Sequence, residues 1–196
     1  MPQAALKRGF DLLGAVFGLS LTIWIILPAW GLASIDTRRN GFFMQERVGQ
    51  DGRIFRVIKI RTMRDVPGMD STVTTGTDQR ITTLGRFWRK SKIDELPQLI
   101  NVVRGDMGLV GPRPDVPGYA DSLQGDDRLV LTVRPGITGP ATLKYRNEED
   151  LLAMQDDPEA YNREVIWPDK VRLNREYVQN WSFWKDLIYI WQTVIH

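Results

Sequence analysis

Two adjacent carboxylates, Asp94 and Glu95, lie in the run SKIDELPQ at residues 91–98. The chain has no cysteine, and its only histidine is the last residue, His196. These counts argue against thiol or imidazole catalysis, because neither side chain is at hand to act as nucleophile or base. Any chemistry must therefore be carried by carboxylates, lysines, arginines or a hydroxyl.

The carboxylate pair has two interpretations at the start of a predicted helix. In the first, Asp94 caps the helix, Glu95 favours its positive end and Pro97 occupies the first turn. In the second, the helix terminus lowers the pKa of the carboxylates and offers free N–H groups to a phosphate. One carboxylate could then attack phosphorus while its neighbour, about 100° around the helix, binds Mg²⁺. The residues alone leave both interpretations open.

Arginines in two proline-containing segments could bind an anion. Arg113 lies in GPRP at residues 111–114, and Arg134 begins RPG at residues 134–136. Flanking prolines restrict the backbone, and a guanidinium matches phosphate oxygens in bidentate fashion. The alternative is a surface loop with a solvated arginine. Further cations flank the carboxylate pair in sequence, namely Lys59, Arg61, Arg86, Arg89, Lys90 and Lys92.

These cations do not indicate a nucleic-acid-binding protein. The chain has 26 basic and 24 acidic residues, for a net charge of +2. It also lacks a recognised module with an aromatic stacking platform, and a strongly apolar segment is attached. We therefore expect no nucleic-acid partner.

The apolar segment spans residues 12–35 (LLGAVFGLSLTIWIILPAWGLASI) without one charged side chain. About 20 such residues can cross a membrane as a helix. Lys7 and Arg8 precede the segment, while further arginines follow it at positions 38 and 39. The positive-inside rule would place both ends on the cytoplasmic face.

A single straight span cannot satisfy that rule at both ends, whereas a helix that enters, bends and returns can. Pro28 is the predicted bend, because proline removes one helical hydrogen bond and clashes with the preceding turn. A simple membrane anchor with one span and a buried helix of a soluble domain are the alternatives.

The remaining chain predicts a mostly helical α+β fold with one β-hairpin. Strands are expected at 42–47 and 53–61, joined through an Asp-Gly turn, followed by a polar loop over 64–80. Helices are expected at 83–92, where the residues are basic and amphipathic, and at 94–103, 148–155 and 169–180. Residues 177–195 carry aromatic and aliphatic side chains at steps of four and three, which indicates one helix. That stripe could face the core or, given its tryptophans, a membrane interface.

Taken together, these segments resemble a bacterial sugar transferase of the monotopic phosphoglycosyl transferase family, as a minimal catalytic unit. Each matching piece is weak alone, but their order and spacing are specific. The pieces are Lys7-Arg8-x-x-Asp11, Phe43-x-Gln45-x-Arg47-x-Gly49, Phe55-x-x-x-Lys59-x-Arg61-Thr62-Met63, Asp78-x-Arg80-x-Thr82-x-x-Gly85, Asp94-Glu95-Leu96-Pro97-Gln98, Asn101-x-x-x-Gly105-Asp106-Met107, Gly111-Pro112-Arg113-Pro114 and Arg134-Pro135-Gly136-Ile137-Thr138-Gly139.

The resemblance implies a reaction in which a UDP-sugar gives its sugar-1-phosphate to a polyprenol phosphate such as undecaprenyl phosphate. It assigns Asp94 as the nucleophile that forms a covalent aspartyl phosphosugar and releases UMP, and Glu95 as the ligand of a Mg²⁺ cofactor. Arg89 and Arg113 are the expected phosphate-binding residues, followed by Lys59, Arg61 and Arg134.

The resemblance also implies an arrangement at the membrane. Residues 1–39 would form a re-entrant membrane helix, and residues 40–196 a catalytic domain with interfacial amphipathic helices on the cytoplasmic face of the bacterial inner membrane. The protein could also form a homodimer, which remains to be tested. Two other classes stay open: a non-catalytic protein that binds polyprenol phosphate, and an enzyme that hydrolyses a nucleotide diphosphate.

Three positions depart from the family pattern. Pro28 follows Leu27, whereas the family usually has Ser-Pro about one turn earlier. Residues 140–146 read PATLKYR in place of a sequence close to WAQVNGR, which leaves the role of this loop open. Asn174 stands three residues before Tyr177, where the family often has aspartate, and Asp169 is the other residue that could take that role.

Overall fold

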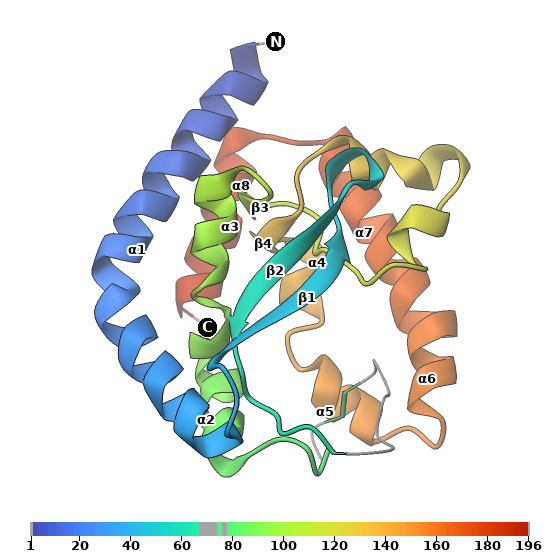
Figure 1. Ribbon diagram of the computed structural model, residues 1–196. Helices are drawn as coiled ribbons and strands as arrows, with labels where there is room; N and C mark the ends of the chain where they lie inside the picture. The colour runs from blue at the N-terminus through green and yellow to red at the C-terminus, as the bar shows by residue number, and fades with distance from the viewer. Residues whose placement is uncertain (1, 67–73, 76–77, 196) are drawn as a thin grey trace.

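The computed structural model describes residues 2–66, 74–75 and 78–195 (Figure 1). One long helix, α1, runs along a flank of a body made of short helices and two small sheets. This architecture confirms the predicted fold of mostly helices with one β-hairpin. The middle of the polar loop predicted at 64–80 lies outside the described residues.

Helix α1 spans Pro2–Thr37 and continues through Pro28 without a break. At 1.5 Å per residue its length is about 54 Å. Figure 1 shows it bowed around the body, so the expected sharp bend at Pro28 is not seen, and re-entry stays a prediction. Packing against the body on its concave side can hold a helix together where proline removes one hydrogen bond.

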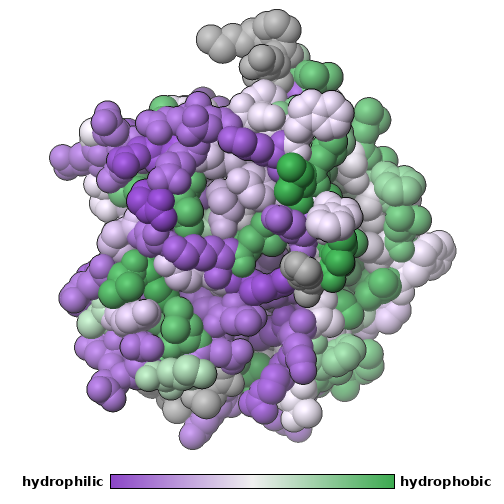
Figure 2. Space-filling view, turned by 180° about the vertical axis from the view of Figure 1, so that it is seen from behind, coloured by the Kyte–Doolittle hydropathy of each residue, from purple (hydrophilic) through white to green (hydrophobic). Residues whose placement is uncertain are grey.

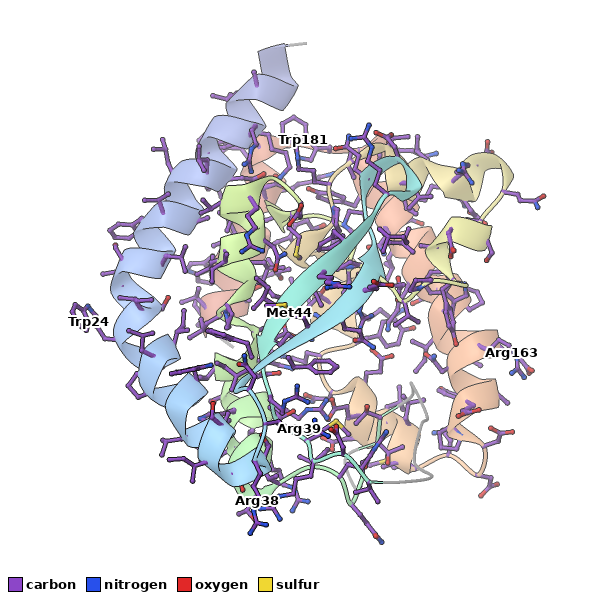
Figure 3. All side chains as sticks on the ribbon, in the orientation of Figure 1. Trp24, Arg38, Arg39, Met44, Arg163 and Trp181 are labelled. Atoms are coloured by element: carbon purple, nitrogen blue, oxygen red, sulfur yellow. The ribbon has the colours of Figure 1, made fainter. Side chains whose placement is uncertain are left out.

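The outer side of α1 is strongly apolar and exposed. Phe17, Trp24 and Ile35 are 65%, 77% and 77% exposed, and Trp24 points away from the body (Figure 3). Among the described residues, α1 is the one helix long and apolar enough to cross a membrane, and only 17% of its apolar window is buried. A buried helix of a soluble domain is therefore the wrong interpretation, because this much exposed apolar surface points to a membrane contact.

Small side chains on the inner side of α1 let it approach the body. Ala29 and Ala33 join Ile26, Ile60 and Trp88 in one buried cluster. Ala15 joins a second cluster with Val57, Val102 and Met107. Removing this apolar surface from water contributes about 25 cal/mol per Å² to stability, which fixes α1 against the elements that carry the carboxylate pair.

The hairpin consists of β1 (Phe42–Val48) and β2 (Ile54–Ile60), paired antiparallel with Phe42 opposite Ile60 and Val48 opposite Ile54. The turn η1 (Gln50–Gly52) places Asp51 at φ 57° and Gly52 at φ 77°. The Asp-Gly turn predicted from the sequence is confirmed, since these two residue types tolerate positive φ well.

The carboxylate pair lies between two helices behind this hairpin. Helix α2 (Thr83–Ser91) begins after Thr82, whose side chain accepts a 2.8 Å hydrogen bond from Gly85 N. A 3₁₀ turn, η2 (Ile93–Glu95), and helix α3 (Gln98–Arg104) follow. The helix predicted at 94–103 therefore starts four residues later than expected.

A second sheet pairs β3 (Gly108–Val110) with β4 (Gly136–Thr138) in parallel, which brings the GPRP segment beside residues 134–136. The backbones are so close that a Cβ at Gly136 would lie 2.1 Å from Gly111 N. Only glycine fits there.

The C-terminal half is helical. Its elements are η3 (Ala120–Ser122), η4 (Gly125–Thr132), α4 (Pro140–Lys144), α5 (Glu148–Ala153), α6 (Pro158–Tyr161), η5 (Asn162–Ile166), α7 (Trp167–Gln179) and α8 (Phe183–Ile195). Helices were predicted at 148–155 and 169–180, and α5 and α7 confirm them.

The single helix predicted over 177–195 is wrong, because α7 ends at Gln179 and α8 begins at Phe183. The two parts of the stripe have different surroundings: Tyr177 is buried, whereas Trp184, Ile188 and Trp191 are more than half exposed. Figure 2 shows apolar side chains gathered on the side of the molecule where α1 and α8 lie. Tryptophans exposed beside a membrane helix favour the interfacial interpretation of α8.

Candidate active site

Asp94 and Glu95 lie on the 3₁₀ turn η2, not at the N-cap of an α-helix. The N-cap residue of α3 is Pro97, and the N-cap residue of η2 is Lys92; neither side chain makes a capping hydrogen bond. The capping interpretation of Asp94 is therefore wrong. What positions the pair is the abrupt turn at Lys92, whose backbone is left-handed at φ 57° and ψ 14°.

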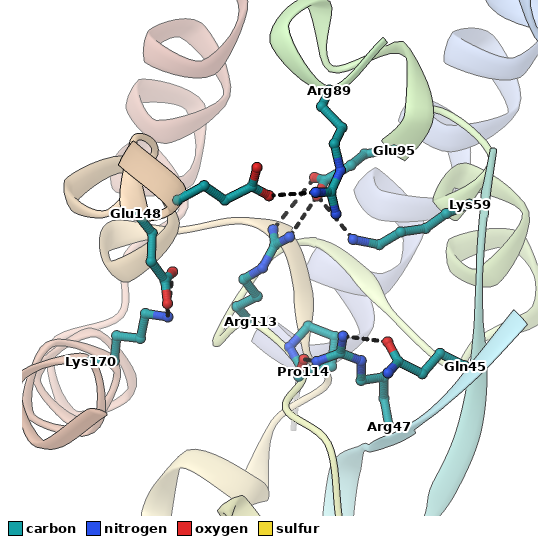
Figure 4. A network of polar contacts seen from close by, with 10 residues as sticks. Gln45, Arg47, Lys59, Arg89, Glu95, Arg113, Pro114, Glu148 and Lys170 are labelled. Carbon is teal, nitrogen blue, oxygen red and sulfur yellow. Dashed lines mark hydrogen bonds and ion pairs between the residues drawn. The ribbon is translucent and has the colours of Figure 1, made fainter. Parts of the chain in front are cut away.

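Glu95 lies at the centre of a cluster of cations (Figure 4). Arg113 Nη2 and Nη1 donate to its Oε1 and Oε2 at 2.5 and 3.4 Å, and Lys59 Nζ donates to Oε1 at 3.2 Å. These residues come from the loop after β3 and from β2, respectively, so three separate segments meet at one carboxylate. The sequence prediction that Glu95, Arg113 and Lys59 share a site is consistent with this geometry.

The cluster shifts the pKa of each member. Burial alone would raise the pKa of Glu95, but the charges of Arg113 and Lys59 outweigh it and hold that pKa well below its usual value. The charge of Glu95 raises the pKa of Arg113. Burial lowers the pKa of Lys59, and the charge of Glu95 opposes that shift. The cluster thus places an ionised carboxylate between Arg113 and Lys59.

Asp94 has a different environment from its neighbour. Its side chain is 7% exposed, and its Oδ1 is buried with no hydrogen-bond partner among the described residues. Burial, followed by the charge of Glu95, raises the pKa of Asp94 to about 6. The expectation that a helix terminus lowers this pKa is therefore wrong, because desolvation dominates on the 3₁₀ turn.

Two further arginines border the pair. Arg89, near the end of α2, pairs with Glu149 of α5 at 3.2 Å, and its charge lowers the pKa of Asp94. Arg47 of β1 donates to Gln45 Oε1 at 2.6 Å and to Pro114 O at 3.2 Å, directly beside the Arg113 loop. The predicted site residues omitted Arg47, although the motif that contains it was available in the sequence.

Arg61 and Arg134 do not join this cluster. Arg61 donates to Asn40 O at 2.9 Å and stacks on the ring of Phe43 at 5.4 Å. Arg134 donates to Gly105 O at 2.9 Å, beyond the C-terminal end of α3 and away from η2. Both arginines bind backbone carbonyls, which indicates that they hold loops in place.

The loop at 140–146 and the two positions near Tyr177 have structural partners. Asp169 of α7 accepts hydrogen bonds from Lys144 and Tyr145, at 2.6 and 2.7 Å. Asn174 is 5% exposed and lines a small cavity behind the Arg113 loop. Its Oδ1 has no partner among the described residues. Asp169 therefore ties α4 to α7, while Asn174 lies close behind the predicted phosphate-binding loop.

A metal ion could find oxygen donors at the carboxylate pair. Within residues 2–66, 74–75 and 78–195, no three His, Cys, Asp or Glu side chains converge as a metal cage. Mg²⁺ does not need one, because it is often held by one or two carboxylates together with substrate phosphates and water. Glu95, whose oxygens accept hydrogen bonds from Arg113 and Lys59, and the adjacent Asp94, whose Oδ1 has no partner among the described residues, form a carboxylate pair of that kind. The residues therefore fit an ion that binds together with a diphosphate.

Comparison with known proteins relates the chain to bacterial sugar transferases. The family model described as bacterial sugar transferase matches residues 2–196. The chain is 39% identical to the uncharacterized sugar transferase EpsL of Bacillus subtilis, over 96% of this chain and 85% of the relative. It is 31% identical to the UDP-glucose:undecaprenyl-phosphate glucose-1-phosphate transferase of Caulobacter vibrioides, over 99% of this chain and 71% of that protein.

The UDP-galactose-lipid carrier transferase of Erwinia amylovora is 36% identical over 96% of this chain, which spans only 39% of that longer protein. The matched region thus contains the whole site built from β1, β2, η2 and the Arg113 loop in each comparison. The chain belongs to the bacterial sugar transferase family.

Proposed function

We propose that this protein transfers sugar-1-phosphate from a UDP-sugar to a polyprenol phosphate, through a covalent intermediate on Asp94. One observation carries the proposal: a buried carboxylate with an unpartnered oxygen lies next to a carboxylate held by two cations. The activities for which the Caulobacter and Erwinia relatives are named support the same pair of substrate classes.

In the first step, an oxygen of ionised Asp94 attacks the sugar-linked phosphorus of the donor. The bond from that phosphorus to the bridging oxygen breaks, and UMP leaves with the electron pair. Arg113 and Lys59 are partly buried cations bound to the adjacent Glu95, and they stabilise negative charge as it develops on the phosphate oxygens.

In the second step, a phosphate oxygen of the polyprenol phosphate attacks the same phosphorus. The bond between phosphorus and Asp94 breaks, and the carboxylate is regenerated. The intermediate lets one small site take a soluble donor first and a lipid acceptor afterwards. Every residue in this scheme comes from one chain, so a homodimer is not required.

A Mg²⁺ ion held by Glu95 and the donor diphosphate would supply further charge neutralisation when bound. Glu95 is suited to this because its pKa lies well below its usual value, so that it stays ionised across the physiological range. Arg113 and Lys59 meanwhile hold its carboxylate in one orientation.

We further propose that α1 enters the membrane and returns, with the catalytic body on the cytoplasmic face. The cations at both ends of α1 support this topology: Lys7 and Arg8 lie near its first residue. Arg38 and Arg39 lie just beyond its last residue (Figure 3). Labelling of single cysteines placed at positions 5 and 38 in intact cells tests it. Reaction of either position from outside the cell would contradict re-entry.

Intact-protein mass spectrometry tests the chemistry. The purified protein is mixed with Mg²⁺ and a panel of UDP-sugars without lipid acceptor, and UMP is measured in parallel. We expect a mass increase equal to one phosphosugar with stoichiometric UMP, and neither in Asp94→Asn. Continuous UMP release without an adduct would indicate hydrolysis instead. Neither signal with any donor would favour a non-catalytic protein that binds polyprenol phosphate.

A further inference from the structure

Lys59 and Lys92 both shift the pKa of each carboxylate in the pair, but they differ in exposure and in their own ion pairs. The charges of Lys59 and Lys92 each lower the pKa of Asp94 and of Glu95. Lys59 is bound to Glu95 at 3.2 Å and is 20% exposed. Lys92 is exposed, and its side chain has no ion pair or hydrogen bond with any described residue. Lys59 therefore shares its charge between Glu95 and any bound anion, whereas the charge of Lys92 has no partner among the described residues.

The backbone holds Lys92 firmly beside the pair. Its N–H donates to Arg89 O at 3.3 Å, and its carbonyl accepts from Glu95 N at 3.2 Å. Its φ of 57° and ψ of 14° are left-handed, a conformation that glycine or asparagine adopts more readily than a lysine. A disfavoured conformation at a functional site suggests that the side chain itself is needed there. The alternative is that its charge merely stabilises the C-terminal end of α2.

The turn that carries Lys92 lies against the membrane helix. Ile93 and Leu96, on either side of the carboxylate pair, pack against the cluster that contains Ile26 and Ala29 of α1. Phe87, one turn earlier on α2, is 60% exposed. An anionic group on a lipid that approaches along α1 would therefore meet this turn.

We propose that Lys92 binds the phosphate of the lipid acceptor. This inference deepens the proposed function and rests on it: the partly buried Arg113 and Lys59 hold the donor phosphates, and the exposed Lys92 holds the acceptor phosphate. The two substrates then use different cations around one nucleophile. Lys92 guides the attacking phosphate toward the phosphorus on Asp94 and takes no part in forming the intermediate.

The test separates the two half-reactions in Lys92→Asn, which keeps a residue suited to the left-handed backbone. Lys90→Gln is the matched control, since it removes an equal charge from an exposed lysine two residues earlier. Lys92→Arg restores the charge. Adduct formation is measured with donor alone at pH 8, well above the pKa of about 6 of Asp94. The KM for undecaprenyl phosphate is measured in neutral nanodiscs.

We expect Lys92→Asn to raise the acceptor KM about tenfold, the effect of losing one charge-assisted hydrogen bond. Adduct formation should stay within about twofold of wild type, Lys90→Gln should match wild type, and Lys92→Arg should recover most of the loss. A slower donor half-reaction with an unchanged acceptor KM would overturn the proposal, as would a change in melting temperature alone.

Binding to vesicles with and without phosphatidylglycerol distinguishes acceptor recognition from general attraction to anionic lipid. If Lys92→Asn and Lys90→Gln weaken vesicle binding and raise the acceptor KM equally, Lys92 is only a surface charge and the proposal fails. A wild-type protein that transfers sugar-phosphate without an adduct would remove the covalent intermediate, yet the acceptor KM would still decide the role of Lys92.

Discussion

Asp186 and Asp94 are both buried aspartates, but their hydrogen bonding is opposite. Asp186 of α8 is 1% exposed and accepts three hydrogen bonds: from Lys7 Nζ at 2.7 Å, Tyr177 Oη at 2.8 Å and Trp181 Nε1 at 3.0 Å. Asp94 is 7% exposed and has one oxygen without any partner among the described residues. Both aspartates are shielded from water, but only Asp186 has hydrogen-bond donors to both of its oxygens.

The difference separates a structural carboxylate from a reactive one. Asp186 ties α8 to Lys7 of α1 and to Tyr177 and Trp181, so both of its oxygens accept hydrogen bonds that hold the structure together. Asp94 keeps an oxygen free beside a cluster of cations, which is unfavourable for stability and suitable for attack on phosphorus. Glu95 is intermediate, since its partners Arg113 and Lys59 are cations that can also bind phosphate.

The largest expected effect is the loss of activity in Asp94→Asn. Removing a nucleophile typically lowers turnover by about 10⁴-fold or more. Adduct formation and steady-state transfer, measured on the same preparation, should both fall to background. Substantial residual transfer would place the nucleophile elsewhere and end the contrast between the two aspartates.

The same variant should be more stable than wild type above pH 6. The folded protein raises the pKa of Asp94 from 3.8 to about 6, so the folded state binds more protons than the unfolded state between these values. Stability is therefore lost as pH rises from about 4 to about 6, and the loss amounts to about 3 kcal/mol. Asparagine removes this dependence, and urea denaturation at pH 5 and pH 8 measures it. A variant less stable than wild type at pH 8 would contradict the desolvation argument.

Asp186→Ala should produce the reverse pattern: a large loss of stability with no role in chemistry. Removing one partner of a buried ion pair costs about 3–5 kcal/mol, because Lys7 and two hydrogen-bond donors lose their acceptor. Urea denaturation measures the loss. Asp169→Ala is the control, since Asp169 is 22% exposed and its pairs should contribute only about 1 kcal/mol. Equal losses in both variants would show that burial of Asp186 is unimportant.

The sequence predicted the reactive aspartate better than the structural one. Asp94 and Glu95 are adjacent in a recognisable motif, and Arg113 and Lys59 stand in motifs of their own. Asp186 is separated from Lys7 by most of the chain, so its partners become visible only when α1 and α8 pack together. Chain-distant contacts of this kind have no local sequence signal.

The sequence predicted which residues form the site, but it did not predict the surroundings that the fold gives them. The sequence placed Asp94 at a helix terminus, where its pKa would fall, whereas the 3₁₀ turn after Lys92 buries it and raises the pKa. The stripe over 177–195 similarly continued through the break between α7 and α8, since Trp181 fits the periodicity although it lies outside both helices. Apolar periodicity shows only the spacing of side chains along the sequence. It therefore cannot reveal a turn between two helices when the spacing continues through that turn.

Arg113→Lys tests whether Glu95 needs a partner of fixed geometry, because the variant keeps a positive charge beside Glu95 but changes the hydrogen bonds to it. Lysine cannot reproduce the two-pronged contact to both oxygens of Glu95, nor the bidentate grip on phosphate. We expect adduct formation to slow by about 100-fold, the usual scale for losing one stabilising donor. Stopped reactions analysed by intact mass measure the rate. A change below about threefold would mean that charge alone, and not geometry, is required at this position.

The pH dependence of adduct formation has the smallest expected effect, about tenfold, and it tests the environment of Asp94 directly. The carboxylate must be ionised to attack, and burial raises its pKa to about 6. The rate should therefore increase about tenfold from pH 5 to pH 7 and level off above that. Because the pKa of Glu95 lies well below its usual value, Glu95 does not titrate in this window and cannot produce the same profile.

Rapid quenching with donor alone isolates this step from acceptor binding. A midpoint near 4 would mean that Asp94 is as well solvated as an ordinary surface aspartate, and the contrast with the satisfied Asp186 would then carry no functional meaning.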